Sequence, residues 1–330
     1  MGVYQINLKK FFTLKTIAQR IENNMNIYPS KVRELVFKKS KQHQFPVIGI
    51  DEISKVIKNV PVVRRGTPAV TMKHGSRKIE YIEPQGVDVV DFVSAADLNN
   101  LRLLEENNVQ GVINGRIDNM LEVVQKTIGA LCAQSLTGAI EYPMIAEGVN
   151  EVYSVSFGDT CELLAGDIVK LTDSSTVKDV YKILDDMASI LEDNNWGGDV
   201  LIFAGKDAYQ MILGILENKS SKQNIIATKI DKSQIEVGGF VITRNKSSYH
   251  DRTGLKREIP DKALCMVDKA APHTLFFTAL DDLDAGLIAS PFWASPGETK
   301  KNPSGIEIIG KSKPLPAPVV KAICWANEVV

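Results

Sequence analysis

The sequence predicts an α+β protein, because segments with the alternation of strands and segments with the period of helices follow one another along the chain. The strongest helix signal covers residues 115–137, and a helix–strand–helix stretch follows between about 174 and 216. The 330 residues, of which 44% are apolar and 24% charged, suffice for two domains with separate cores. No apolar run approaches the roughly 20 residues that cross a bilayer, so we expect no membrane segment and synthesis in a cytoplasm.

The first 50 residues are typical of an extended arm with short helices. Residues 13–21 place their apolar side chains on one helical stripe, and Tyr28-Pro29 then interrupts the pattern. Ser30 stands where a helix N-cap belongs, so we expect a short helix from there through Val36.

Short strands replace this pattern from Val47 to Val93. Apolar runs separated by turn residues predict a long hairpin between about 55 and 82. Five basic side chains lie on it: Arg64, Arg65, Lys73, Arg77 and Lys78. A two-stranded ribbon is marginal by itself in water, so this one needs a support. That support is either a neighbouring subunit or the edge of a sheet in the same domain.

One long amphipathic helix is predicted at residues 115–137. Seven apolar positions fall on one face of it: Ile117, Met120, Leu121, Val124, Ile128, Leu131 and Cys132. Gly138 follows where a C-terminal cap belongs. The helix would be about 34 Å long, enough to span one face of a sheet.

Shorter elements fill the rest of the chain. Residues 139–170 predict a second hairpin, Ser174 or Ser175 is expected to cap the next helix, and 200–204 is a buried strand. Asp207 opens another helix. Further strands are predicted near 235–243, 263–267, 275–277, 305–310 and 319–326, with a polar stretch at 290–305 and a stiff link at Pro314, Pro316 and Pro318.

Charge divides the chain into a basic beginning and an acidic remainder. Residues 1–80 contain 11 lysines and five arginines against five acids, a net charge of +11, whereas the remainder carries −12. The basic part can bind nucleic acid, lie on the acidic body of another copy, or form a merely solvated face. Contact between copies explains both halves of the charge distribution together.

Sequence patterns for nucleotide binding are missing. Ala204-Gly205-Lys206 follows a strand but lacks the remaining residues of a phosphate-binding loop. Gly197-Gly198 precedes a strand instead of opening a helix. We therefore assign no cofactor-binding residue.

The sequence gives equally little support for a metal site or a catalytic site. The four cysteines are far apart and are expected to be buried thiols: Cys132, Cys161, Cys265 and Cys324. The acidic clusters Asp185-Asp186 and Asp281–Asp284 lack the spacing of a calcium loop. Asp88 and Asp91 lie three apart on a strand and would face opposite sides of it. We assign no catalytic or metal-ligating residue and predict a protein that is not an enzyme.

Three stretches carry a resemblance to a known family. They are the segment from Asp91 to Arg102, the helix exit Ala133-Gln134-Ser135-Leu136-Thr137-Gly138-Ala139-Ile140, and the tail from Phe292-Trp293-Ala294 through Lys313-Pro314-Leu315-Pro316 to Val329. In this order the chain resembles the major capsid protein E family, the lambda-type head proteins of tailed phages. The likeness covers nearly the whole chain.

The resemblance implies the tailed-phage capsid fold of the Hong Kong 97 type. Residues 1–50 would be the N-terminal arm and 51–95 the extended hairpin loop with its flanking strands. Residues 96–165 and 270–330 would form the peripheral domain around the helix 115–137, and 166–269 the axial domain. The five basic hairpin residues would contact a neighbouring subunit.

The same resemblance implies a function and partners. Copies would assemble in the cytoplasm of a bacterial host into pentamers and hexamers of an icosahedral shell around double-stranded DNA, and the protein would reside in the virion. Partners would be further copies, scaffold, portal and head-decoration proteins, and DNA in non-specific contact. Three alternatives stay open: another phage structural protein, a nanocompartment shell protein of the same fold, and an α+β enzyme.

Overall fold

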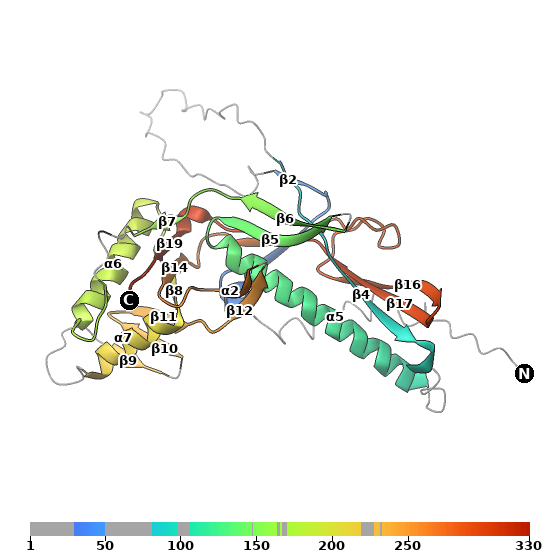
Figure 1. Cartoon of the computed structure of the whole chain (residues 1–330). Helices are drawn as coiled ribbons and strands as arrows, with labels where there is room; N and C mark the ends of the chain where they lie inside the picture. The colour runs from blue at the N-terminus through green and yellow to red at the C-terminus, as the bar shows by residue number, and fades with distance from the viewer. Residues whose placement is uncertain are drawn as a thin grey trace, which may run out of the picture.

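The fold is organised around one long helix, with a mixed sheet at one end of it and strands along its length (Figure 1). The computed structural model describes residues 30–49, 81–97, 106–146, 148–163, 166, 170–218, 228–231, 233–251 and 253–330. The helix predicted at 13–21 and most of the hairpin predicted between about 55 and 82 lie outside these residues. Within the described ranges, no helix is both long and apolar enough to span a membrane.

Helix α5 (Glu106–Ser135) is the long helix that the sequence predicts at 115–137. Its 30 residues rise about 45 Å. The predicted apolar face is confirmed, since side chains such as Ile117, Val124 and Ile128 are buried in one cluster. The start was predicted too late, because Gly111 and Gly115 weaken the helical signal of the first turns.

An antiparallel ribbon lies along the first half of α5. Its strands, in spatial order, are β16 (Trp293–Lys301), β17 (Ser304–Ser312) and β4 (Val87–Ser94). Val93 of β4 and Ile308 of β17 belong to the same buried cluster as Ile113 of α5. The strand predicted at 305–310 is confirmed, and β16 is a further strand within the polar stretch predicted at 290–305. There β16 completes the ladder with its backbone while its second half exposes polar side chains.

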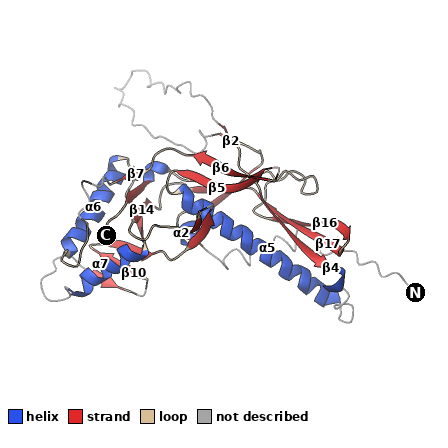
Figure 2. Ribbon diagram, in the orientation of Figure 1, coloured by secondary structure: helices blue, strands red, loops and turns tan. Residues whose placement is uncertain are grey.

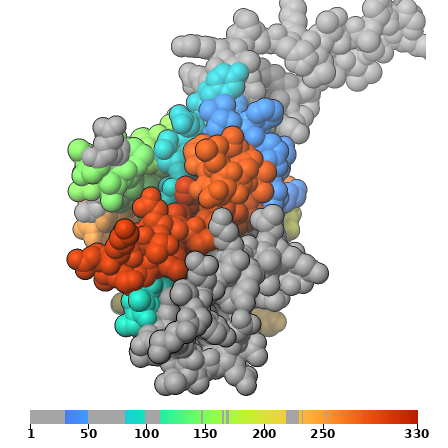
Figure 3. Space-filling view, turned by 90° about the vertical axis from the view of Figure 1, so that its right-hand side faces the viewer, coloured from blue at the N-terminus to red at the C-terminus, as the bar shows by residue number. Residues whose placement is uncertain are grey.

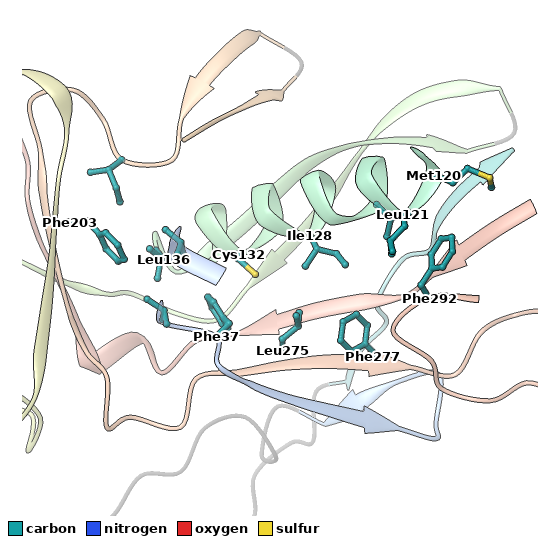
Figure 4. Packing of buried hydrophobic residues seen from close by; sticks show 14 of the residues in the cluster. Phe37, Met120, Leu121, Ile128, Cys132, Leu136, Phe203, Leu275, Phe277 and Phe292 are labelled. Carbon is teal, nitrogen blue, oxygen red and sulfur yellow. The ribbon is translucent and has the colours of Figure 1, made fainter. Parts of the chain in front are cut away.

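A second small sheet packs on the other half of α5. Its strands, in spatial order, are β1 (Lys39–His43), β15 (Thr274–Thr278) and β18 (Pro314–Ala317). Leu275 and Phe277 point toward α5 (Figure 4), whereas Phe276 is buried on the opposite side. That opposite side is covered by the hairpin of β5 (Ala139–Ala146) and β6 (Val149–Ser156), which confirms the second predicted hairpin.

The prolines near the end of the chain lie in a strand and not in a free link. Pro314 and Pro316 belong to β18 and pair with β15. Proline has no N–H to donate, and β18 is an edge strand, so no ladder hydrogen bond is lost on its outer side. The predicted link was therefore right in being extended and wrong in being unpaired.

Helix α2 (Lys31–Leu35) attaches the beginning of the described chain to this body. The Ser30 side chain accepts a hydrogen bond from the Arg33 N–H at 3.3 Å, which confirms the predicted cap. Val32 and Phe37 are buried in the cluster around α5. Residues 30–37 are thus part of the core instead of an outlying arm.

The mixed sheet has seven strands. In spatial order they are β7 (Cys161–Glu162), β19 (Ile323–Ala326), β14 (Leu264–Asp268), β8 (Val200–Ala204), β11 (Phe240–Arg244), β10 (Gln234–Val237) and β9 (Thr228–Ile230). Helices α6 (Val177–Asp193) and α7 (Lys206–Asn218) lie together at the outer end of the molecule (Figure 2). The hairpin of β12 (Ser248–Asp251) and β13 (Gly254–Arg257) projects beside the end of α5.

Both faces of this sheet are buried, which explains the continuous apolar run at 200–204. Ile202 and Ala204 belong to the cluster under α6 and α7, and Leu201 and Phe203 belong to the cluster around α5. The sheet therefore joins the two cores. It also extends beyond residues 166–269, because β7 and β19 come from outside that range.

Two predicted boundaries in this region need correction. Thr176, and not Ser174 or Ser175, is the N-cap of α6: its N–H and its hydroxyl both bond to Asp179, at 2.6 and 2.8 Å. The strand predicted at 319–326 starts only at Ile323, because a short 3₁₀ helix, η2 (Val320–Ala322), comes first.

Gly138 ends α5 in a conformation that other residues rarely adopt. Its φ is +89°, and a Cβ atom built there would lie 2.2 Å from the carbonyl oxygen of Gly158. Gly148, in the turn of the β5–β6 hairpin, has a similar φ of +81° but open space around it. Substitutions at these two positions therefore distinguish the cost of backbone strain alone from the cost of strain combined with a steric clash.

We expect Gly138→Ala to lower the free energy of unfolding far more than Gly148→Ala. The Gly148 variant meets only the left-handed backbone cost of about 1–2 kcal/mol, whereas the Gly138 variant must also displace a neighbouring backbone segment. Urea unfolding followed by circular dichroism measures both. Equal losses in the two variants would show that the close approach to Gly158 tolerates a methyl group.

His273 lies where the chain leaves the mixed sheet for the sheet under α5. Its Nε2 donates to the Asp268 carbonyl oxygen at 3.1 Å, and its Nδ1 accepts the Val319 N–H at 3.1 Å. Burial lowers the pKa of His273 to about 4. The ring of folded His273 is therefore neutral. Protonation of Nδ1 would break the hydrogen bond that this atom accepts from the Val319 N–H.

We expect stability to fall as the pH is lowered from about 6.5 to about 4, because the unfolded chain binds a proton there that folded His273 does not. The loss attributable to this group is at most about 3 kcal/mol. Urea unfolding across this range measures it. His273→Gln should flatten the profile, and His250→Gln, at an exposed histidine, should leave it unchanged.

Candidate functional site

The five basic residues predicted to contact a neighbour lie outside the described residues. They are Arg64, Arg65, Lys73, Arg77 and Lys78. The structure does place the two ends of their segment. Strands β2 (Ile48–Gly49) and β3 (Tyr81–Ile82) pair antiparallel, so the two ends of the segment lie side by side.

A hollow of about 460 Å³ lies close to that point. It is bordered by the residues before β4, by α5, by the β5–β6 hairpin and by the loop after β15. Its lining combines apolar, aromatic and charged side chains: Gln85, Val87, Asp88, Thr127, Leu131, Tyr142, Pro143, Met144, Ile145, Tyr153, Leu280, Asp281, Lys311, Ser312 and Lys313. Figure 3 shows the hairpin in green and the loop in orange on either side of the cyan residues before β4.

Two lysines of the hollow are held by aspartates of the loop. The Lys313 ammonium donates to Asp281 at 2.7 Å, and its side chain is 4% exposed against 77% for Asp281. The Lys311 ammonium lies 2.8 Å from Asp282. The Asp282 carboxylate also accepts the backbone N–H groups of Asp284 and Ala285. These bonds tie the loop to β17 and fix its shape.

Asp88 is the third acid of this region. Among the described residues it forms no ion pair, and Lys311 and Lys313 act on it only from longer range. Burial, together with the charges of Asp281 and Asp282, raises the pKa of Asp88. Asp88 is therefore the acid of this region that no described lysine holds in an ion pair.

Tyr153 lies deeper in the same hollow. Burial raises the pKa of Tyr153 to about 12. Its hydroxyl faces the backbone of Gln85 at a geometry short of a hydrogen bond, and it has no other partner in the described part of the chain. The Tyr153 hydroxyl is thus a buried polar atom without a hydrogen bond among the described residues.

Asp88 and Asp91 do lie on opposite sides of β4, as predicted. Asp91 lies 3.5 Å from Arg116 of α5, whereas Asp88 borders the hollow beside Lys311. The two carboxylates therefore do not act as a pair.

The remaining candidate groups do not gather into a site. All four cysteines are buried and free, as predicted, and burial raises the pKa of each thiol. In the ranges that the structure describes, no three metal-ligating side chains come together. In the acidic run at 281–284, Asp281 and Asp282 are paired with lysines some 30 residues away.

Comparison with known proteins gives a clear family. The family model described as phage major capsid protein E matches residues 13–327. No match was found among curated proteins.

A solved structure with the same fold is among the matches. A protein of an E. coli CFT073 prophage, assigned as its capsid protein, is 13% identical with a TM-score of 0.62, over 95% of this chain and 98% of the other. A virus-like particle from Pyrococcus furiosus is 12% identical with a TM-score of 0.44, over 95% and 99% of the two chains.

Removing Asp281 and removing Lys313 from their ion pair should have unequal effects on stability. Asp281→Ala should lower the free energy of unfolding by about 1–3 kcal/mol, because it leaves a buried ammonium without its carboxylate. Lys313→Met should cost less, because an apolar side chain of similar length replaces the buried charge while Asp281 stays in water. Urea unfolding compares them, and a larger loss in Lys313→Met would contradict the assignment.

Proposed function

This chain belongs to the phage major capsid protein E family, and we propose that its copies assemble into the pentamers and hexamers of an icosahedral shell that encloses double-stranded DNA. As a major capsid protein of a phage or prophage it is a structural component of the virion. The observation that carries the proposal is the family match from residue 13 to residue 327, which spans both cores of the fold. We infer that its role is structural rather than catalytic.

The segment between β2 and β3 is the proposed contact between neighbours. Its two ends pair with each other at Ile48 and Ile82, so the segment can project without disturbing the core. Between residues 53 and 79 it carries seven basic side chains and no acid. The remainder of the chain is acidic, so a projecting segment finds opposite charge on another copy.

Shell assembly needs contacts that are individually weak. A subunit that contacts several neighbours gains stability from their sum, while a misplaced subunit with one contact dissociates. Ion pairs at the rim of such contacts are screened by salt. Assembly of this protein should therefore weaken as ionic strength rises.

We propose that the two cores correspond to the domains of the capsid fold. The region around α5, with residues 96–165 and 270–330, is the proposed peripheral domain. Residues 166–269, with α6 and α7, are the proposed axial domain, to which β7 and β19 contribute two strands. Contacts with scaffold, portal and decoration proteins and with packaged DNA stay predictions.

We expect Arg64→Glu combined with Arg65→Glu to leave the subunit folded and to block assembly. The substitution reverses two charges of the projecting segment, so attraction to an acidic neighbour becomes repulsion. Circular dichroism measures folding, and electron microscopy of the purified protein measures assembly.

Arg64→Lys combined with Arg65→Lys is the matched control. It keeps both charges and should keep closed particles. Normal particles from the glutamate variant would refute the role of this segment, and the absence of particles from the unmodified protein would refute the proposed function itself.

A further inference from the structure

Two of the buried thiols lie next to each other in the mixed sheet. Cys161 of β7 and Cys324 of β19 are paired residues of two neighbouring parallel strands, which lie side by side near α6 (Figure 1). Both side chains belong to the cluster under α6 and α7, so they point to the same face of the sheet. Neighbouring strands are about 4.8 Å apart, and a disulfide joins residues whose Cα atoms are about 4.4–6.8 Å apart. The backbone therefore already holds these two cysteines within the range of a disulfide.

The contacts of Cys161 place its sulfur against the segment that carries Cys324. The Cys161 thiol donates to the carbonyl oxygen of Lys321 at 3.8 Å, and Lys321 belongs to η2, directly before β19. The same sulfur accepts the side-chain N–H of Asn194, the C-cap of α6, at 3.6 Å. The sulfur is thus held where β7, η2 and the end of α6 meet.

The other two cysteines are on the wrong side of the sheet to join this pair. Cys265 of β14 is opposite Trp325, and both point into the cluster around α5. Cys132 belongs to α5 and to that same cluster. A disulfide from Cys324 to either of them would have to cross the sheet. The fold therefore selects one pairing out of those that four cysteines allow.

Cys161 is the more exposed cysteine of the pair. It is 8% exposed, whereas Cys324 is fully buried, so an oxidant reaches Cys161 first. Burial raises the pKa of the Cys161 thiol, and the charge of Lys321 opposes this rise. Burial raises the pKa of Cys324 to about 12. Both groups are therefore protonated at neutral pH, and they react slowly because only the thiolate is a nucleophile.

We propose that Cys161 and Cys324 form a disulfide within one chain when a low-molecular-weight disulfide serves as the oxidant. The Cys161 thiolate attacks one sulfur of the small disulfide and releases the other as a thiolate. The Cys324 thiolate then attacks the Cys161 sulfur of this mixed disulfide and releases the second small thiolate. The two cysteines lose their protons to water and are oxidised, and the small disulfide is reduced to two thiols.

This disulfide fixes the weakest edge of the mixed sheet. Strand β7 is an edge strand of two residues, and its ladder continues only through the bond from the Leu163 N–H to the Trp325 carbonyl oxygen at 2.8 Å. An edge with so few bonds opens more readily than the middle of a sheet. The disulfide also encloses every other strand of the sheet in one long loop, which restricts the unfolded chain.

In a capsid protein the disulfide acts late. The inside of a cell keeps thiols reduced, whereas a released particle meets an oxidising medium. The reduced pair leaves the subunit free to fold and assemble, and the oxidised pair stabilises it afterwards. This timing rests on the proposed function, whereas the disulfide itself is a property of the folded chain.

The test compares the full-length protein incubated in mildly alkaline buffer with oxidised glutathione or with dithiothreitol. Free thiols are counted after denaturation, and mass spectrometry of the non-reduced digest identifies the joined peptides. We expect the count to fall from four to two thiols per chain, with one disulfide between Cys161 and Cys324. The oxidised protein should unfold at a temperature about 5–15 °C higher than the reduced protein.

Cys265→Ala is the matched control, because it removes a buried thiol from the same sheet but from its opposite face. It should keep both the disulfide and the thermal shift, whereas Cys324→Ala should lose both. Four thiols after prolonged oxidation, glutathione attached to Cys161 alone, or a disulfide to Cys132 or Cys265 would overturn the proposal. A disulfide between Cys161 and Cys324 without a higher unfolding temperature would overturn its stabilising role.

The timing is tested on protein taken from cells lysed in denaturant with an alkylating agent, and on particles treated with oxidised glutathione before the same step. We expect the two thiols to be reduced in the first sample and joined in the second. A disulfide already present in the cells would overturn the timing alone. Absence of particles would overturn the proposed function and leave the disulfide of the folded chain standing.

Discussion

The apolar stripe of α5 is the constraint on which the rest of the structure depends. A helix of about 45 Å cannot bury such a stripe on one small sheet. It is covered in succession by β4 and β17, by β15, and by the inner face of the mixed sheet. Figure 4 shows the part of it from Met120, in the middle of the helix, to Leu136, just beyond its end. Strands from the beginning, the middle and the end of the sequence must therefore meet on one helix.

The end of the chain closes this arrangement. Trp325 of β19 donates its indole N–H to the carbonyl oxygen of Leu136 at 2.8 Å, just beyond the last turn of α5. The neighbouring residue Cys324 points to the other side of the sheet, into the cluster under α6. One short strand thus satisfies a carbonyl at the end of the helix and completes both cores. Neither lobe can be described without the last few residues.

Local sequence patterns predicted the helices and strands better than they predicted which of these elements pack or pair with one another. The stripe of α5, the cap at Ser30 and the run at 200–204 were found because each depends on residues close together in the chain. The strand β16 was missed because exposed polar side chains hide a strand whose backbone is paired on only one side. The pairing of Lys311 and Lys313 with Asp282 and Asp281 was missed because it depends on the folded ladder of β17.

The features of the exposed edge strands limit the ways in which two copies of the protein can contact each other. An unprotected edge strand pairs with any other strand, which would compete with an ordered shell. Here β1 carries Lys39 and Lys41 on its exposed residues, and β16 is interrupted by an irregular register between Pro296 and Thr299. On the third edge, β18 carries two prolines that cannot donate. At these three edges strand addition between copies is disfavoured, so side-chain surfaces of defined charge and shape are favoured there as contacts. Such surfaces fix one geometry of contact, which a closed shell requires and open strand addition does not provide.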